Sequence, residues 1–321
     1  MAREFDHILL IGFGGPERPE EIRPFLEIVS RGRAIPEPRL AEVAGHYERI
    51  GGRSPYNQSV FRLAERLEES LCRQGTALPI FSAMRNWHPF LKDVIRTIRS
   101  KGFQKAAGVI LAPHRSEASC GRYLKAVEEA RQDSGAGDYE CAYLKTWHDH
   151  PLFIQGQAEQ VRRILDQIPA GKKTRYHLLF SAHSIPVEME KQSRYAEEFR
   201  RSCELVAQEL NYSDWSLAYQ SRSGNPNQPW LEPDICAVIR GLKAKGNDGI
   251  VVVPIGFVCD NAEVLYDLDI EAREEAAKIG LEYFRAPVIM DHPQFAAMLT
   301  ELIQDELARP AGSFENRENG F

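Results

Sequence analysis

A single histidine at the end of an apolar run is the first residue of this chain that is placed to do chemistry. His183 follows the run HLLFSA (177–182) within the segment FSAHSIP. An imidazole at the end of a buried strand can exchange protons near neutral pH or contact a metal ion. A histidine that only caps a turn would occupy the same position, so the spacing alone leaves both readings open.

Three carboxylates with helical spacing follow another apolar run, in the segment CDNAEVLYDLDIEAREEAAK (259–278). Asp260 and Glu263 have the spacing of an N-cap and its capping box. Glu263, Asp267 and Glu271 then recur at i, i+4 and i+8, on one face of the expected helix. Each like-charge pair of this kind costs an isolated helix about 0.2–0.5 kcal/mol. A bound cation would offset that repulsion, and a solvated acidic face is the alternative.

Short apolar runs alternate with amphipathic helices, an order typical of parallel sheets covered on both faces. The runs form two sets, so we expect an α/β fold of two doubly wound, Rossmann-like domains with parallel sheets, residues 1–150 and 151–308. The halves resemble each other in pattern rather than in residues. The last helix (293–308) is expected to pack on the first half, and the tail (309–321) to be loose. The expected strands are 7–12, 78–84, 106–113, 141–146, 177–182, 216–221, 249–257 and 281–286.

Several loops at the ends of these strands are candidates for ligand binding, because such sheets bind ligands beyond their carboxyl ends. The first strand runs into GFGGP (12–16), but Glu17 replaces the third glycine of a dinucleotide motif. These glycines therefore indicate a tight turn or a backbone close to a flat ligand. The segments IGGRSPYNQ (50–58) and QSRSGNPNQPWLEPDI (220–235) also read as functional loops.

Composition excludes several classes of protein. With 321 residues, 43% hydrophobic and 27% charged, the chain reads as a soluble globular protein. A formal net charge of −6 gives no basic footprint for nucleic acid. No apolar run approaches the ~18 residues of a membrane span, and the N-terminus reads as a strand rather than a signal peptide. Six scattered cysteines without a CxxC pair indicate reduced thiols and a cytoplasmic location.

Seven segments in order resemble the ferrochelatase family along nearly the whole chain: LLIGFGGP, GHYERIGGRSPYNQ, MRNWHPF, LAPHRSEASCGRY, FSAHSIP, QSRSGNPNQPWLEPDI and PIGFVCDNAEVLYDLDIE. The resemblance implies a lyase of haem biosynthesis that inserts Fe²⁺ into a porphyrin held in a cleft between the two halves. It implies that His183 accepts protons and that Glu263 handles the metal or a proton. It places Asp267 and Glu271 on a route or outer site for the metal.

The segments RGRAIPEP (31–38), HYERIGGRSP and GFVCDNAEVLYDLDIE are most similar to the monofunctional type of the family that metallates coproporphyrin III. The alternative within the family is protoporphyrin IX. The resemblance implies a monomer with iron as substrate, without a cofactor or an iron–sulfur cluster. Four of the expected porphyrin contacts follow from the family, and the arginines follow from the affinity of guanidinium for carboxylates. The expected contacts are Phe13, Ser30, Arg31, His46, Tyr47, Arg53, Ser54 and Tyr123.

The chain also departs from the family. Phe13 stands where the coproporphyrin type often has a tyrosine, so it has no oxygen to offer the product iron. Asn261 stands where Asp-His is common, and Asn86 where His or Tyr often occurs. Three other functions remain open: a chelatase for another metal or tetrapyrrole, a non-catalytic haem or porphyrin carrier, and a periplasmic-type binding protein. The last would require a signal peptide.

Overall fold

Two parallel four-stranded sheets, one from each half of the chain, form the framework of the protein. The computed structural model describes residues 5–32, 35–223 and 228–309. The strand orders are β2-β1-β3-β4 and β6-β5-β7-β8, so the two sheets share one topology. This confirms the expected fold of two doubly wound α/β halves. The domain limits at residues 150 and 151 stay predictions.

The first sheet and its helices come from residues before 144. The elements are β1 (His7–Gly12), η1 (Pro19–Glu21), α1 (Ile22–Val29), α2 (Glu37–Arg49), α3 (Tyr56–Arg73), β2 (Ile80–Met84), α4 (Leu91–Ser100), β3 (Lys105–Ile110), η2 (Glu117–Gly121), α5 (Arg122–Asp133) and β4 (Glu140–Tyr143).

The second half repeats this alternation of strands and helices. Its elements are α6 (Pro151–Leu165), η3 (Ala170–Arg175), β5 (Tyr176–His183), α7 (Val187–Glu190), α8 (Tyr195–Glu209), β6 (Trp215–Gln220), α9 (Ile235–Leu242), η4 (Lys243–Lys245), β7 (Gly249–Val253), η5 (Val264–Ala272), α10 (Arg273–Lys278), β8 (Glu282–Arg285) and α11 (Pro293–Ala308).

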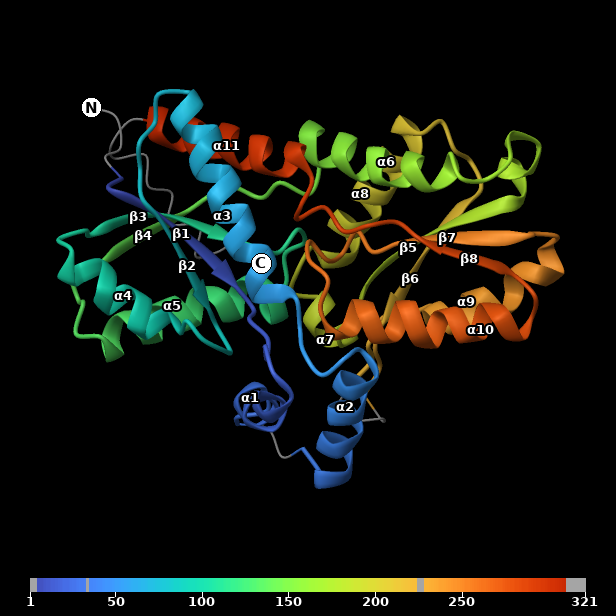
Figure 1. Ribbon diagram of the computed structural model, residues 1–321, viewed down its shortest axis with the longest axis horizontal. Coiled ribbons are helices and arrows are strands. Elements are labelled where there is room, and N and C mark those ends of the chain that lie inside the picture. The colour runs from blue at the N-terminus through green and yellow to red at the C-terminus, as the bar shows by residue number, and fades with distance from the viewer. Residues whose placement is uncertain (1–4, 33–34, 224–227, 310–321) are drawn as a thin grey trace.

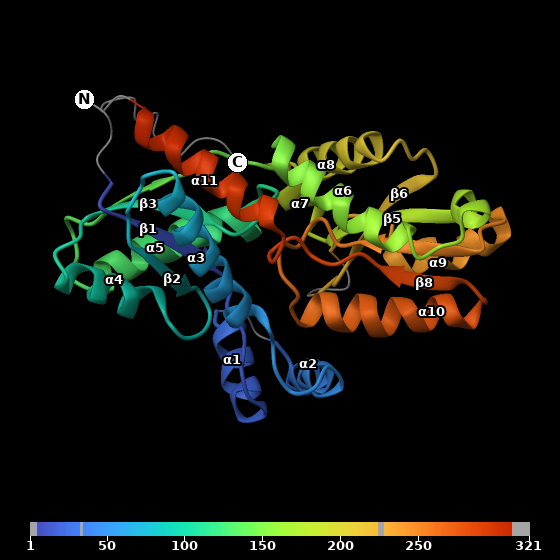
Figure 2. The same cartoon turned by 45° about the horizontal axis from the view of Figure 1, so that its top comes forward.

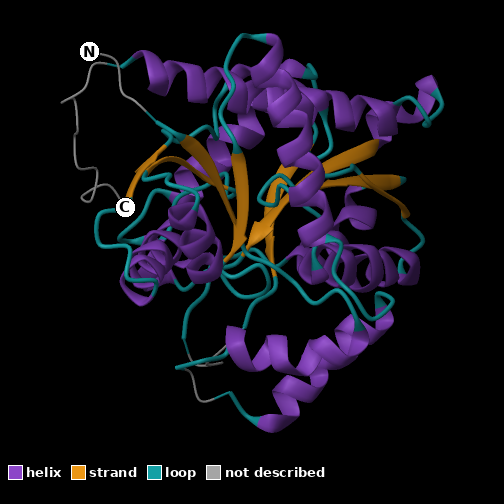
Figure 3. Ribbon diagram, turned by 60° about the vertical axis from the view of Figure 1, so that its left-hand side comes forward, coloured by secondary structure: helices purple, strands orange, loops and turns teal. Residues whose placement is uncertain are grey.

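The central strands are buried along almost their whole length. Every residue of β1 and β7 is buried, and so is every residue of β5 except His183 at its end. Helices cover both faces of each sheet (Figure 3), which explains why these strands are continuous apolar runs without alternation. The expected strand 249–257 ends early, at Val253, because Pro254 has no N–H to continue the ladder.

Helix α11 crosses from the second half to the first. Helix α6 follows β4 of the first sheet and packs against α8 and β7 of its own, second half. Helix α11 follows β8 of the second sheet but packs against α3 of the first half, and it also contacts α6. Figure 2 shows α11 crossing from the second half to lie along α3. The halves therefore share one continuous core.

Helices α6 and α11 also begin with similar segments, which share four of their five residues. The segments are DHPLF (149–153) and DHPQF (291–295). In each, the histidine Nδ1 accepts a hydrogen bond from the backbone N–H two residues on, at 3.3 Å. The buried phenylalanine of each segment packs against the same tryptophan, Trp147. The two segments lie about 140 residues apart in the sequence.

Helices α1 and α2 lie together beside the sheets rather than on them, below both in Figure 1. Phe25 of α1 contacts Tyr47 of α2 and Trp87 edge-to-face, with ring centroids 6.1 and 5.9 Å apart. Phe13 and Ala262 pack against this cluster of apolar side chains. The pair of helices thus stands next to the ends of β1 and β7.

Two further expectations concern the ends and surface of the chain. The tail expected to be loose lies outside the described residues, apart from Arg309. Among the described helices, none is both long and apolar enough to cross a membrane.

Candidate active site

The candidate site lies at the carboxyl ends of the central strands of both sheets. In each sheet the connections change direction between the two central strands, β1 and β3 or β5 and β7. Such a switch point is where doubly wound sheets bind ligands. Phe13 directly follows β1, His183 ends β5, and Glu263 lies in the segment after β7.

His183 and Glu263 face each other as a close pair. Nε2 of His183 lies 3.4 Å from Oε1 of Glu263, and the two side chains keep 30% and 42% of their surfaces exposed. Nδ1 of His183 donates a hydrogen bond to the backbone carbonyl of Ser184. That bond fixes the ring orientation and leaves Nε2 as the nitrogen that faces the site.

The pair is charged in the isolated protein. Burial lowers the pKa of His183, but the charge of Glu263 and the hydrogen bonds to Glu263 and Ser184 raise it to about 9. Burial raises the pKa of Glu263, but the charge of His183 and hydrogen bonds from His183 and Asn261 outweigh burial and lower it. At neutral pH the site therefore holds an imidazolium beside a carboxylate.

The helix that carries the carboxylates is a π-helix rather than the expected α-helix. η5 spans Val264–Ala272 and begins directly after Glu263. A π turn closes with i→i+5 hydrogen bonds and holds more residues than the 3.6 of an α-helix. Residues four apart therefore lie more nearly above one another, which brings Glu263, Asp267 and Glu271 into line.

The start of this helix differs from the expected capping box. Asn261, not Asp260, is the capping residue, because its Oδ1 accepts a hydrogen bond from the N–H of Val264 at 2.9 Å. The Asp260 carboxylate instead pairs with Arg285 of β8, at 3.1 Å. Glu263 is thus free of any capping role, and its carboxylate is left for the site.

Asp267 and Glu271 continue from Glu263 along the helix. Ser221 donates a hydrogen bond to Asp267. Burial raises the pKa of Asp267, and with the charges of Glu263 and Glu271 it brings the value to about 7 in spite of Ser221. Burial and the charge of Asp234 raise the pKa of Glu271. Among the described residues, no three His, Cys, Asp or Glu side chains are grouped closely enough to form a metal site.

The cations near this helix pair with its outer carboxylates. Arg285 holds Asp269 in a bidentate ion pair at 2.7 and 2.9 Å. Arg49 of α2 contacts Glu274 at 2.7 Å, and Arg240 of α9 contacts Glu275 at 3.0 Å. These three arginines come from elements distant in the sequence, so the spacing within the acidic segment does not reveal them.

The residues expected to contact a porphyrin fall into two groups. Tyr47, Ser54, Ser30 and Tyr123 are buried at 5–9% exposure, whereas Arg31 and Arg53 are exposed. Burial raises the pKa of Tyr47 and of Tyr123, and the charge of Glu263 contributes to both. These two phenols therefore lie near Glu263. Other residues of the protein bury both side chains, so a role for them in porphyrin binding stays a prediction.

His46 lies flat against the π-helix. Its ring stacks on Tyr266 with centroids 3.6 Å apart and an interplanar angle of 7°. Arg49, one turn further along α2, donates to the Tyr266 hydroxyl at 3.3 Å. α2 is thus attached to the helix that follows Glu263.

Phe13 and the glycines after it contact the first residue of α3 and the segment just before that helix. The Phe13 N–H donates to the Tyr56 hydroxyl at 3.0 Å. Gly14 has a φ of +86°, and a Cβ on Gly15 would lie 2.6 Å from the Cβ of Ser54. The structure shows a close contact of this segment with Ser54, and both readings of the motif stay predictions.

Sequence reasoning missed the residues behind the pair. The N–H of Ser184 donates to the carbonyl of Gln220 at 2.8 Å, and the Tyr195 hydroxyl donates to the carbonyl of His183 at 2.9 Å. Gln220 and Ser221 begin the loop 220–235 that composition had marked as functional. Which of its residues mattered depended on the tertiary contacts.

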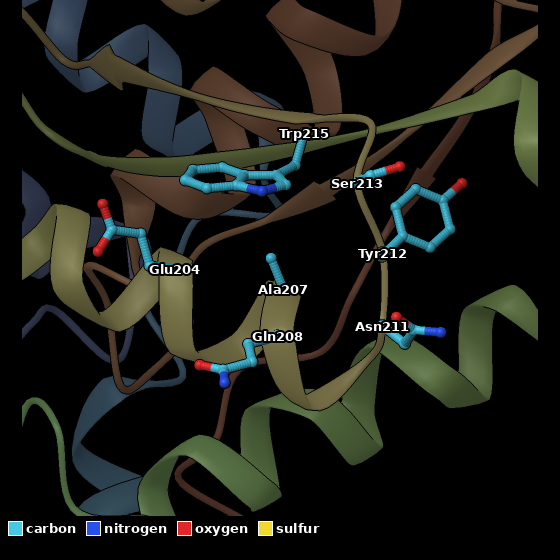
Figure 4. Close-up of a pocket in the computed structure, with 7 residues that line it drawn as sticks. All are labelled: Glu204, Ala207, Gln208, Asn211, Tyr212, Ser213 and Trp215. Carbon is cyan, nitrogen blue, oxygen red and sulfur yellow. The ribbon is translucent and has the colours of Figure 1, made fainter.

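A separate shallow pocket lies at the opposite end of β6. It is lined by Glu204, Ala207, Gln208, Asn211, Tyr212, Ser213 and Trp215 (Figure 4). Trp215 begins β6, whereas Gln220 at its other end pairs with His183. This pocket therefore belongs to the amino ends of the strands and is not part of the candidate site.

Comparison of the sequence with known proteins identifies its family. The model of the ferrochelatase family matches residues 6–307. This chain belongs to the ferrochelatase family. It is 37% identical to the coproporphyrin III ferrochelatase of Nocardia farcinica, with 94% of this chain and 88% of that protein covered. It is 39% identical to the coproporphyrin III ferrochelatase of Mycobacterium avium (95% and 88%), and 38% identical to the ferrochelatase of Rhodopirellula baltica (95% and 87%).

Solved structures show the chelatase fold at much lower identity. SirB from Bacillus subtilis with Fe3+ superposes on this ferrochelatase with a TM-score of 0.59 at 11% identity, covering 97% of this chain and 99% of that one. The sirohydrochlorin chelatase SirB from Bacillus subtilis subspecies spizizenii in complex with cobalt gives 0.58 at 12% (97% and 99%). As a ferrochelatase, the chain acts on a porphyrin and iron.

Proposed function

We propose that this ferrochelatase inserts Fe²⁺ into coproporphyrin III, with His183 and Glu263 on opposite faces of the macrocycle. The observation that carries the proposal is the His183–Glu263 pair at the switch point of the second sheet. Relatives named for coproporphyrin III, at 37–39% identity, support the choice of porphyrin.

The reaction removes two pyrrole protons and delivers Fe²⁺ to the ring nitrogens. In the isolated protein His183 already carries a proton, because Glu263 raises its pKa. A macrocycle placed between the two groups separates them and removes that support. Burial then lowers the pKa of His183, so the imidazolium releases its proton to solvent, and the neutral ring accepts a pyrrole proton at Nε2.

Glu263 acts from the other face. When the macrocycle separates Glu263 from His183, the Glu263 carboxylate faces the ring centre without its cationic partner. It then attracts Fe²⁺ or the second proton. Asp267 and Glu271 extend a line of oxygens away from that centre along η5. We infer that they pass iron or protons along the helix, which agrees with the raised pKa of each.

The four carboxylates of coproporphyrin III require donors at the periphery. Arg31 follows α1, and Arg53 precedes α3; both are exposed. We infer that these guanidinium groups bind propionates. We infer that the other residues expected to contact the porphyrin also bind it. Phe13 offers an apolar face beside the ring and no ligand for iron. We further infer a cytoplasmic monomer.

One assay tests the function and the porphyrin together. The purified protein is given Fe²⁺ with coproporphyrin III or protoporphyrin IX, and the Soret band is followed. We expect faster insertion into coproporphyrin III. A preference for protoporphyrin IX would refute the choice of porphyrin, and tight binding of either without insertion would indicate a carrier.

The roles of the pair are tested by substitution. His183→Ala and Glu263→Gln should each abolish insertion while leaving porphyrin affinity, measured by porphyrin fluorescence, within about twofold, since peripheral contacts dominate binding. If either variant turned over at the rate of the unmodified protein, the assigned roles would be wrong.

A further inference from the structure

Both members of the pair are tied to the end of β6, a strand that supplies neither of them. Gln220 lies opposite His183 in the β5–β6 register. Its backbone carbonyl accepts the N–H of Ser184 at 2.8 Å. Its side-chain Nε2 donates to the backbone carbonyl of Glu263 at 3.0 Å. One residue thus holds the backbone on each side of the site.

The side chain of Gln220 is costly for the fold. It is 2% exposed, and its Oε1 is buried with no hydrogen-bond partner among the described residues. A buried acceptor without a partner destabilises the fold, and an apolar side chain of the same length would avoid that penalty. Stability therefore does not explain this glutamine, whereas its bond to Glu263 does.

The next residue is strained and holds the next carboxylate. Ser221 has a φ of +61°, a left-handed conformation that favours glycine. Its hydroxyl donates to Asp267, which glycine could not do. Strain of this kind persists where the surrounding structure requires it, often at functional sites.

We propose that Gln220 and Ser221 are positioning residues for metal insertion, with Gln220 setting the separation of His183 and Glu263 and Ser221 fixing Asp267. The proposal rests on the function proposed above, since it assigns these residues to the same site. Neither side chain needs to touch the porphyrin. Displacement of a reacting group by about 1 Å can cost a hundredfold in rate, so a bond to one backbone carbonyl is enough to matter.

Gln220 is tested against a matched glutamine. Gln160 of α6 is also buried, at 4% exposure, and its Nε2 also donates to a backbone carbonyl, that of Val288, at 3.2 Å. We compare Gln220→Met with Gln160→Met for kcat and KM with Fe²⁺ and coproporphyrin III, porphyrin affinity by fluorescence, and Tm. We expect kcat to fall about ten- to hundredfold in Gln220→Met alone, with porphyrin affinity unchanged.

Ser221 is tested by separating stability from activity. Ser221→Gly removes the hydroxyl but suits the positive φ, so we expect Tm to be kept or raised while kcat falls. The effect should be absent in an Asp267→Asn background, because Ser221 acts through that carboxylate. This cycle still decides the proposal if Gln220→Met does not fold.

The outcomes separate the two proposals. If the unmodified protein inserts iron but Gln220→Met matches Gln160→Met, the positioning role of Gln220 is refuted and the proposed function stands. The role of Ser221 is refuted if Ser221→Gly keeps full activity. It is also refuted if Ser221→Gly lowers kcat by the same factor in the unmodified protein and in the Asp267→Asn background. If the unmodified protein inserts iron into neither porphyrin, the proposed function and this inference are both refuted.

Discussion

The chemistry of His183 depends on two opposing influences. Burial disfavours its charged form, and the neighbouring Glu263 favours it. The result in the isolated protein is a charged histidine, which is the wrong form for a proton acceptor. On the mechanism proposed above, a substrate that separates the pair reverses the balance, and its binding generates the base.

Removing the partner charge should therefore shift the balance toward burial. In Glu263→Gln the pKa of His183 should fall from about 9, because burial lowers it and only Ser184 and Asp267 still raise it. NMR titration of the His183 ring measures both values. His177, which pairs with Asp214 at 2.8 Å, is the internal control and should not move. A His183 pKa unchanged by the substitution would show that Glu263 does not support its charge.

The same pair links folding stability to pH. A raised histidine pKa adds stability that is fully present below 6.5 and is lost as the pH rises through about 9. The lowered pKa of Glu263 adds stability above 4.5 that is lost at more acid pH. The free energy of unfolding, measured with a denaturant, should therefore exceed that of Glu263→Gln between these limits. The difference should decline toward pH 9. Solvent screens the partly exposed pair and keeps the effect modest.

Asp267 should make iron handling depend on pH. Its pKa of about 7 means that it changes from acid to carboxylate as the pH rises through neutrality. The carboxylate attracts a cation better than the acid, so KM for Fe²⁺ should fall over that range. Asp267→Asn should remove this change. An unaltered pH profile of KM in the variant would exclude Asp267 from the iron route.

At the scale of elements, the loop after β7 must come very close to β5. The Gly256 N–H donates to the carbonyl of Ser181 at 3.0 Å, and a Cβ on Gly256 would lie 2.5 Å from that of Ala182. Ala182 directly precedes His183. This contact brings the segment leading to Glu263 against the strand that ends in His183.

An added methyl group at that contact should displace both the segment leading to Glu263 and the strand that ends in His183. We expect Gly256→Ala to cost about 1–3 kcal/mol of unfolding free energy, as other overpacked cores do, and to lower kcat because His183 moves. Gly241→Ala is the control, since nothing lies within 4 Å of a Cβ there. Urea unfolding and the insertion assay measure the two effects. Equal behaviour of the two variants would show that the loop can move aside at no cost.

At the scale of the molecule, the packing of α11 across the two halves makes them interdependent. Helix α11 belongs in sequence to the second half but covers apolar surface of the first, and it also contacts α6. The ion pairs of Arg62 and Arg66 with Asp291, each at 3.0 Å, lie at the start of the returning helix. The two sheets, and the site between them, are therefore held in a fixed relation.

Neither half should fold alone. Fragments 1–150 and 151–321, expressed separately, should each bind a hydrophobic dye and unfold without a cooperative transition, because each leaves core surface uncovered. Mixed together, they should regain a cooperative Tm. A cooperative transition in either isolated fragment would show that the packing of α11 on α3 is dispensable for the folding of that fragment.

Sequence reasoning predicted local patterns better than local geometry. It placed the strands, the site histidine and the carboxylate face, because continuous apolar runs and i, i+4 spacing are visible in one dimension. It misplaced the helix cap at Asp260, because Asn261 and Asp260 are both good caps and the choice depends on Arg285, a residue of β8. It also missed the π-helix, which the spacing of residues does not distinguish from an α-helix.

The sequence by itself determined the two parallel sheets, the family, and the identities of His183 and Glu263, since these follow from residue types and their order. Only the tertiary structure decided that the two side chains meet at 3.4 Å as a charged pair, that Gln220 contacts the backbone beside both, and that Ser221 contacts Asp267. The reason is physical: a pKa depends on burial and on charges brought close in space. Those neighbours come from β5, β6 and η5, which only the folded chain assembles.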